Sequence, residues 1–214
     1  MESETIDFAS DGFTLHGKLS QHVSQKKMSV VVLHPHPLYG GNMNNHVVKE
    51  LDRIFQREGF TTFRFDFRGA SASPLGYPGV VGAVTDALNA ITTLKSLTGH
   101  KEVGIAGYSF GAAVAFRAAL LTSPPFLVSL SASKALIMED RFDIERLRNI
   151  ECPTLMFHGK DDDVIPFEDL LDIAEGIQLD LRFTNLLDGE GHFYQKSLPI
   201  VGSDIHRIIG TLFA

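Results

Sequence analysis

The sequence contains a single cysteine, Cys152, among its 214 residues. One thiol cannot close an intramolecular disulfide and has no second thiol with which to form a zinc-binding pair. A disulfide-stabilised scaffold is therefore excluded, and we expect a reducing compartment. The first fifteen residues carry four acidic side chains and no apolar run, which is not the pattern of a signal peptide. These features predict a cytoplasmic protein.

Long apolar runs are also missing. Nowhere do eighteen apolar residues stand together, so the sequence predicts no transmembrane helix. Positive charge is scarce, because 19 Lys and Arg stand against 26 Asp and Glu, a net charge of −7 with no basic cluster. This balance argues against a nucleic-acid backbone or an anionic membrane as the main partner.

The composition is that of a folded globular chain, with 44% hydrophobic and 21% charged residues. A chain of this length buries about 70% of its unfolded surface in one core. We therefore expect a single domain over residues 1–214.

Hydrophobic periodicity predicts the fold class. Short β-branched and aromatic runs alternate with stretches of helical spacing, the pattern of a mostly parallel sheet with helices on both faces. The opening differs, because two short strands flank Ser10-Asp11-Gly12, a turn signal that predicts an antiparallel hairpin at the sheet edge. Strands are expected at 6–9, 13–19, 29–33, 61–65, 103–106, 126–130, 154–157 and 181–186, and helices at 45–57, 80–97, 110–121, 167–175 and 200–212.

Two connections bear on access to a site. The link from residue 130 to residue 154 has only about twenty residues, which is too few for a lid domain. The segment 70–79 is rich in Gly, Pro and Ser, so we expect a surface loop that follows a strand end.

The strongest local motif is Gly-Tyr-Ser-Phe-Gly at 107–111, between a predicted strand and a predicted helix. A serine on so tight a turn has a strained backbone, and glycines flank it where a Cβ would collide with a neighbouring element. The turn exposes the Ser109 hydroxyl above the sheet, and the helix behind it aims free N–H groups at a developing oxyanion. Ser109 is thus a candidate nucleophile. The alternative is a chance motif in which the serine only caps the helix.

A serine hydroxyl is a weak nucleophile and needs a histidine base that an acid orients. Three successive acids, Asp161, Asp162 and Asp163, follow the predicted strand 154–157, and His192 follows the next one. Each interval leaves room for a strand and a helix, so these groups can converge at the carboxyl edge of one sheet. An acidic run alone is usually a solvated loop. The combination and its order of serine, acid and histidine predict a catalytic triad.

With these motifs the chain resembles the α/β-hydrolase superfamily over essentially its whole length. The family's acid loop, His-Gly-x-x-Asp-x-x-Val-Pro, corresponds to residues 158–166 and implies Asp162 as the triad acid, with Asp163 as the alternative if the loop slips by one residue. The family's Gly-His-Phe motif corresponds to 191–193 and implies His192 as the base. Its Asp-x-Arg-Gly motif corresponds to 66–69, where we expect a structural charge network.

An oxyanion hole needs two backbone donors. One is expected at Phe110, immediately after the nucleophile. The other is expected in the loop His-Pro-His-Pro-Leu-Tyr-Gly-Gly at 34–41, where the prolines have no N–H and leave His36 as the donor. This loop resembles that of a small, lidless, mostly bacterial branch of the superfamily, similar to dienelactone hydrolases and esterases.

The same loop admits a second interpretation as a metal site, because His34, His36 and His46 could supply imidazoles. Alternate side chains of an extended segment point to opposite faces, however, and no carboxylate follows at a suitable spacing. We therefore expect no metal and no cofactor.

The predicted function is a serine hydrolase that cleaves carboxylic esters or thioesters of small or exposed acyl groups through an acyl-enzyme. The partners we expect are a small-molecule acyl substrate and water, with no nucleic acid and no membrane. Two alternatives stay open: a peptidase or amidase acting on short peptides, and a non-catalytic binding protein of the same fold. Neither the hairpin nor the last helix decides the oligomeric state. The expected pocket is shallow and bounded by loop 70–79 with Leu38, Tyr39, Tyr108 and Phe193.

Overall fold

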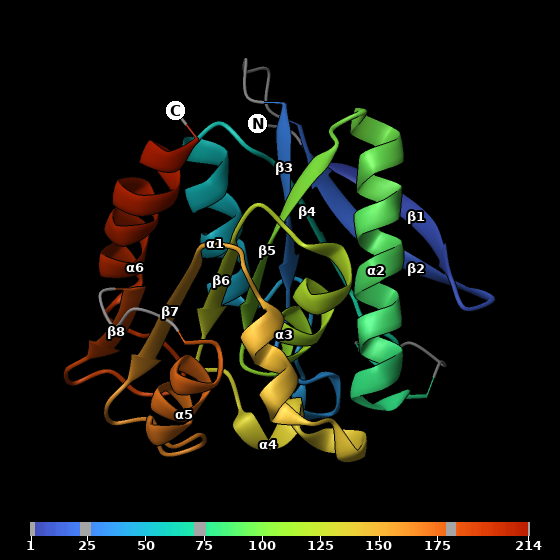
Figure 1. Cartoon of the computed structure of the whole chain (residues 1–214). Helices are drawn as coiled ribbons and strands as arrows, with labels where there is room; N and C mark the ends of the chain where they lie inside the picture. The colour runs from blue at the N-terminus through green and yellow to red at the C-terminus, as the bar shows by residue number, and fades with distance from the viewer. Residues whose placement is uncertain (1–2, 22–26, 71–75, 179–182, 214) are drawn as a thin grey trace.

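The computed structural model describes residues 3–21, 27–70, 76–178 and 183–213 (Figure 1). Within these residues, the sheet has eight strands in the order β1-β2-β4-β3-β5-β6-β7-β8. The first two strands form an antiparallel hairpin at one edge, β2 pairs with β4 antiparallel, and the remaining pairs are parallel. The strands are β1 Glu4–Ser10, β2 Phe13–Ser20, β3 Met28–Leu33, β4 Thr61–Phe65, β5 Glu102–Tyr108, β6 Leu127–Leu130, β7 Thr154–Gly159 and β8 Thr184–Leu187.

Helices cover both faces of the sheet, which is why every residue of the central strand β3 is buried. The helices α2, α3 and α5 lie on the near face in Figure 1, and α1 and α6 pack together on the other face. The carboxyl ends of the parallel strands point to the lower side of that view, so the loops that follow them gather there. The helices are α1 His46–Arg57, α2 Gly79–Thr98, α3 Phe110–Thr122, α4 Lys134–Ile137, α5 Glu168–Gly176 and α6 Leu198–Ile205.

Each face of the sheet has its own apolar core. On the side of α2 and α3, the rings of Phe63, Phe65 and Phe67 pack in sequence along the end of β4, because alternate residues of a strand share a face. On the side of α1 and α6, the rings of Phe55 and Phe126 stack at a centroid distance of 5.7 Å. These two cores fix the strand register that brings the loops of the site together.

A buried charge network ties the hairpin to the sheet and to α2. Asp86 has no exposed surface, and Nε of Arg68 lies 2.9 Å from its Oδ1. The hydroxyl of Ser10 donates to the same oxygen at 2.6 Å, and Asp11 pairs with Arg68 at 3.2 Å. The structural role predicted for the motif at 66–69 is confirmed.

The predicted fold class is confirmed, including the edge hairpin. The strands and helices lie within a few residues of their predicted positions, with one departure at the C-terminal end. There α6 begins two residues early and gives way to a π-helical turn, His206–Gly210, so the helix predicted over 200–212 is not regular. Residues 71–75 of loop 70–79, and residues 181–182 of the last predicted strand, lie outside the described residues.

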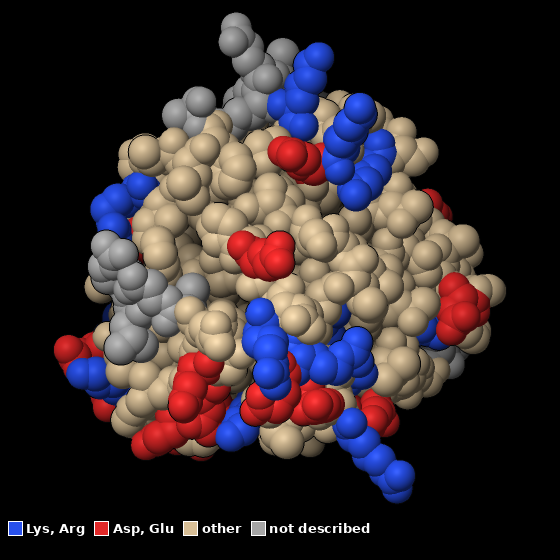
Figure 2. Space-filling model, in the orientation of Figure 1, with Lys and Arg blue, Asp and Glu red and all other residues tan. Residues whose placement is uncertain are grey.

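The link between β6 and β7 contains short helical turns that the sequence did not predict: α4 and the 3-10 turns Glu139–Arg141 and Ile144–Asn149. They form no additional domain over the nucleophile, in agreement with the short length of the link. Within the described ranges, no helix is long and apolar enough to span a membrane. Figure 2 shows positive and negative side chains interleaved on the face of the protein that is seen in Figure 1.

Candidate active site

Ser109 lies on a sharp turn between β5 and α3. Its backbone has a φ of 56° and a ψ of −117°, a strained conformation for a residue with a side chain. At both flanking glycines, the Cβ of any other residue would collide with neighbouring backbone. A Cβ on Gly107 would lie 2.3 Å from the Gly111 carbonyl oxygen, and one on Gly111 would lie 2.4 Å from the Leu33 carbonyl oxygen. The predicted turn and the reason given for its glycines are confirmed.

His192 connects Ser109 to Asp162 by two contacts. Its Nε2 lies 3.1 Å from Oγ of Ser109, and its Nδ1 lies 2.8 Å from Oδ2 of Asp162. Because a carboxylate only accepts, Nδ1 carries the hydrogen, which leaves Nε2 free to accept the serine proton. The three side chains come from the turns after β5, β7 and β8, and all are almost fully buried. The structure thus brings together the three residues proposed for the triad.

The acid beside His192 is Asp162, whereas Asp163 is exposed to solvent. The Oδ1 atom of Asp162 accepts the amides of Val164 and Ile165 at 3.0 and 2.9 Å, which closes the turn after β7. Burial opposes ionisation of this carboxyl, but contacts with the imidazoles of His158 and His192 and the Ile165 amide outweigh it. They hold the pKa of Asp162 well below its usual range.

The two expected oxyanion donors belong to residues in contact. The imidazole ring of His36 lies 4.8 Å from the ring of Phe110 between centroids. His36 lies in the loop after β3, a tight turn in which the His36 carbonyl accepts the amides of Tyr39 and Gly41 at 3.1 and 3.0 Å. Phe110 is the first residue of α3, so its N–H has no acceptor within the helix. The loop after β3 therefore packs directly against the turn that carries Ser109.

The metal interpretation of the loop fails at His34. Its Nε2 accepts the Phe67 amide at 2.9 Å, and its Nδ1 donates to the Pro35 carbonyl at 2.6 Å, so neither nitrogen is free. His46 instead turns its Nε2 to the Phe193 carbonyl at 2.7 Å. In the described part of the chain, no three His, Cys, Asp or Glu side chains gather as a metal site would require. Burial lowers the pKa of His34 to about 4, which keeps this imidazole neutral.

Three of the four residues proposed for the pocket are exposed at the carboxyl edge of the sheet: Leu38 at 60%, Tyr39 at 88% and Phe193 at 56%. The prediction for Tyr108 is wrong. Its side chain is only 1% exposed, and its hydroxyl donates to the His192 carbonyl at 2.8 Å. Tyr108 is the last residue of β5, and its side chain is buried in the core. It therefore contacts the backbone of His192 and does not line the opening of the pocket.

The sequence did not identify two polar groups that organise the site. Glu190 is 2% exposed, and its carboxylate accepts the amides of Gln195, Lys196 and Ser197, which closes the loop that carries His192. Burial opposes ionisation of Glu190, but these N–H groups outweigh it and lower its pKa. The second group is the imidazole of His158, buried against Asp162. Glu190 lies in a glycine-rich turn, and only its position beside the candidate base could have drawn attention to it. His158 is the first residue of the motif at 158–166, to which the sequence analysis gave no role of its own.

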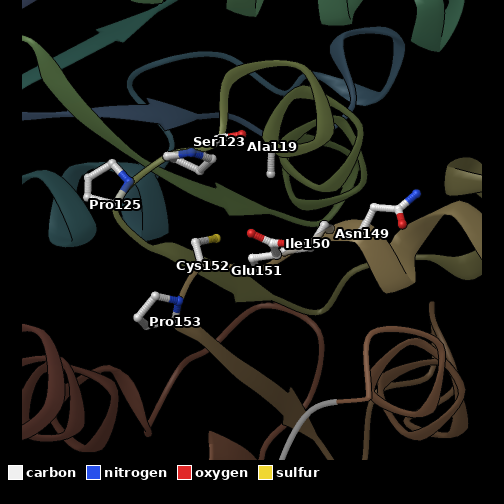
Figure 3. A pocket seen from close by; sticks show the side chains of 9 residues that line it. Ala119, Ser123, Pro125, Asn149, Ile150, Glu151, Cys152 and Pro153 are labelled. Atoms are coloured by element: carbon white, nitrogen blue, oxygen red, sulfur yellow. The ribbon is translucent and has the colours of Figure 1, made fainter.

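A separate pocket lies at the amino ends of the parallel strands, on the side of the sheet away from Ser109. It has a volume of about 410 Å³ and lies between the end of α3 and the start of β7, with Ser123, Glu151 and Cys152 in its walls (Figure 3). Burial raises the pKa of the Cys152 thiol, which keeps it protonated. This pocket is remote from Ser109, because the amino ends and carboxyl ends of parallel strands lie at opposite edges.

The model of the dienelactone hydrolase family matches residues 15–192. The chain belongs to this family. Among curated proteins, it is 29% identical over 206 residues to an uncharacterised protein of Rickettsia prowazekii, covering 92% of this chain and 85% of that one.

Two solved structures support the fold of this dienelactone hydrolase family member. An α/β serine hydrolase homologue from Coxiella burnetii is 26% identical, with a TM-score of 0.85 and 97% of each chain covered. A lidless α/β serine hydrolase from Xanthomonas campestris is 22% identical, with a TM-score of 0.83 and 99% and 95% of the two chains covered. The protein is an α/β-hydrolase enzyme, and its family implies water and a small molecule as substrates.

Proposed function

We propose that this protein, acting as one catalytic domain, hydrolyses carboxylic esters or thioesters through a covalent acyl-serine. The observation that carries the proposal is the position of His192 between Ser109 and Asp162, with 3.1 and 2.8 Å to the two partners. These distances lie within the reach of a general base and of the acid that orients it.

In the proposed mechanism, Nε2 of His192 takes the proton of Ser109 as Oγ attacks the acyl carbonyl. The negative charge that develops on the carbonyl oxygen is received by the backbone N–H groups of Phe110 and His36. The anionic Asp162 stabilises the imidazolium, which then protonates the leaving group. Water, deprotonated by the same imidazole, then attacks the acyl carbonyl. The bond to Oγ breaks, the imidazolium returns the proton to Oγ, and the carboxylic acid and free Ser109 are released.

The mouth of the site favours small acyl groups or groups that remain partly outside the protein. Its proposed edges, Leu38, Tyr39 and Phe193, are open to solvent, and the β6–β7 link adds only short helical turns. A long acyl chain would gain little burial in such a site. Because the chain has a single cysteine, we also propose a cytoplasmic location.

The test is hydrolysis of p-nitrophenyl esters of increasing acyl length by the natural protein and by Ser109→Ala. We expect kcat/KM to be highest for short acyl groups, and Ser109→Ala to lower kcat by at least about a thousandfold. Undiminished hydrolysis by Ser109→Ala would contradict the proposal. Matched anilides test the amidase alternative, which gains support only if amide and ester rates are comparable.

A further inference from the structure

A second imidazole contacts the carboxylate that faces His192. His158 is the fifth residue of β7 and has no exposed surface. Its Nε2 lies 2.9 Å from the Ile165 carbonyl oxygen and 3.3 Å from Oδ2 of Asp162. The mechanism proposed above gives this histidine no part.

The contacts of His158 identify its protonation state. Both groups near Nε2 are acceptors, so Nε2 carries the hydrogen. The Nδ1 atom is buried and has no partner among the described residues. A hydrogen on Nδ1 would be a buried donor without an acceptor, which costs more than a vacant lone pair. His158 is therefore the neutral Nε2–H tautomer and acts toward Asp162 as a donor.

These hydrogen bonds fasten the turn that presents the carboxylate. The Nε2–H of His158 donates to the Ile165 carbonyl, and the Ile165 amide donates in return to Oδ1 of Asp162 at 2.9 Å. The other carboxylate oxygen, Oδ2, receives Nδ1–H of His192 and lies beside the Nε2–H of His158. Removing the His158 N–H has two effects. The Ile165 carbonyl loses its donor, and Oδ2 of Asp162 loses one of the two imidazole N–H groups beside it.

We propose that His158 is a positioning residue, which fixes the rotation of the Asp162 carboxylate and shares its Oδ2 atom with His192. The proposal rests on the proposed function, and His158 acts only through Asp162 and does not touch substrate. Among the described residues, the other titratable groups that face Asp162 are Tyr108 and Tyr194. Burial raises the pKa of both phenols well above the usual range, so they stay neutral where an esterase is assayed.

Two variants separate donation from packing. His158→Leu removes the N–H and keeps an apolar side chain, whereas His158→Gln places an amide N–H near the position of Nε2. Met156→Leu is the matched control, because Met156 is a buried residue of the same strand and face. We expect His158→Leu to lower kcat ten- to a hundredfold with KM within about twofold, and His158→Gln to recover most of the loss.

The pH profile of kcat/KM separates positioning from a general loss of structure. Without the neighbouring N–H, Oδ2 becomes a stronger acceptor for the imidazolium of His192, so the acid limb moves to higher pH in His158→Leu and stays in place in His158→Gln. Activity of His158→Leu equal to that of Met156→Leu overturns the proposal. So do equal losses in both His158 variants when their melting temperatures match the natural protein.

Nitrogen-15 NMR of the histidine side chains tests the proposal without catalysis. We expect the Nε2–H tautomer for His158 at pH 7, and a low-field Nδ1–H proton of His192 that is altered in His158→Leu and retained in His158→Gln. An imidazolium or Nδ1–H form of His158, or an unaltered His192 signal in His158→Leu, overturns the proposal. If the natural protein hydrolyses no ester, the proposed function fails. These spectra still show whether His158 donates to Asp162 and alters the hydrogen bond of His192.

Discussion

The hydroxyl of Tyr108 donates to the backbone carbonyl of His192 across a distance of 2.8 Å, although 84 residues separate them in the sequence. Tyr108 immediately precedes Ser109, so one hydrogen bond connects the turn of the nucleophile to the loop of the base. The phenol is buried, and burial raises its pKa well above the usual range. This contact fixes the position of the His192 backbone relative to Ser109.

Tyr108→Phe tests that connection. Loss of the hydroxyl leaves the buried His192 carbonyl without this donor, which costs about 1–3 kcal/mol of unfolding free energy. We expect the melting temperature to fall and kcat to fall several-fold, because His192 becomes less well placed. Thermal melts and ester kinetics measure the two effects. If kcat is unchanged while the protein is destabilised, the bond is structural only.

Asp162→Asn and Asp163→Asn test which acid orients His192. The amide introduced by Asp162→Asn can donate to Nδ1 of His192 and favours the wrong imidazole tautomer, so we expect kcat to fall by about 10³- to 10⁴-fold. Asp163 is exposed and serves as the matched control, and its variant should keep kcat within about twofold. The reverse pattern in the same ester assay would transfer the role to Asp163.

His34 gives a prediction for stability against pH. Its pKa is lowered from 6.5 to about 4 by burial, so the unfolded chain binds more protons than the folded protein between these values. The unfolding free energy therefore falls as pH drops from 6.5 to 4, by up to about 3 kcal/mol from this residue. Urea unfolding at pH 7 and pH 4.5 measures the drop. His34→Gln should show a smaller drop than the natural protein, and an equal drop would assign the loss to other groups.

Asp86 anchors the buried network that joins the hairpin to α2. Removing its carboxylate in Asp86→Ala leaves the Arg68 guanidinium, only 6% exposed, without its nearest anion. Such a loss costs about 3–5 kcal/mol. We expect a large fall in the urea midpoint with an unchanged pH profile of any remaining ester hydrolysis. Glu50→Ala, which breaks exposed pairs with Arg53 and Arg57, is the control and should change the midpoint little.

Much of the fold was predictable because its signals are local. Apolar strands such as β3 are buried on both faces, and the glycines around Ser109 mark a close approach that only one kind of turn makes. The π-helical turn at the C-terminal end was not predictable, since the apolar periodicity of residues 200–212 fits a regular helix.

The candidate site was predictable only where a motif carried the information. From the residues alone, any of three successive acids could have faced His192, and the register of the turn after Gly159 selects Asp162. Tyr108 was misplaced because its partner is a backbone carbonyl far away in sequence. Glu190 was missed because an acid in a glycine-rich turn resembles a solvated residue until the amides of 195–197 fold over it.

The most direct test of an activated Ser109 is intact-mass spectrometry after treatment with a fluorophosphonate probe. The natural protein should gain the mass of one phosphonyl adduct, and both Ser109→Ala and His192→Ala should gain none under the same conditions. An adduct that persists in Ser109→Ala, or a natural protein that stays unlabelled while a control serine hydrolase reacts fully, would contradict the account.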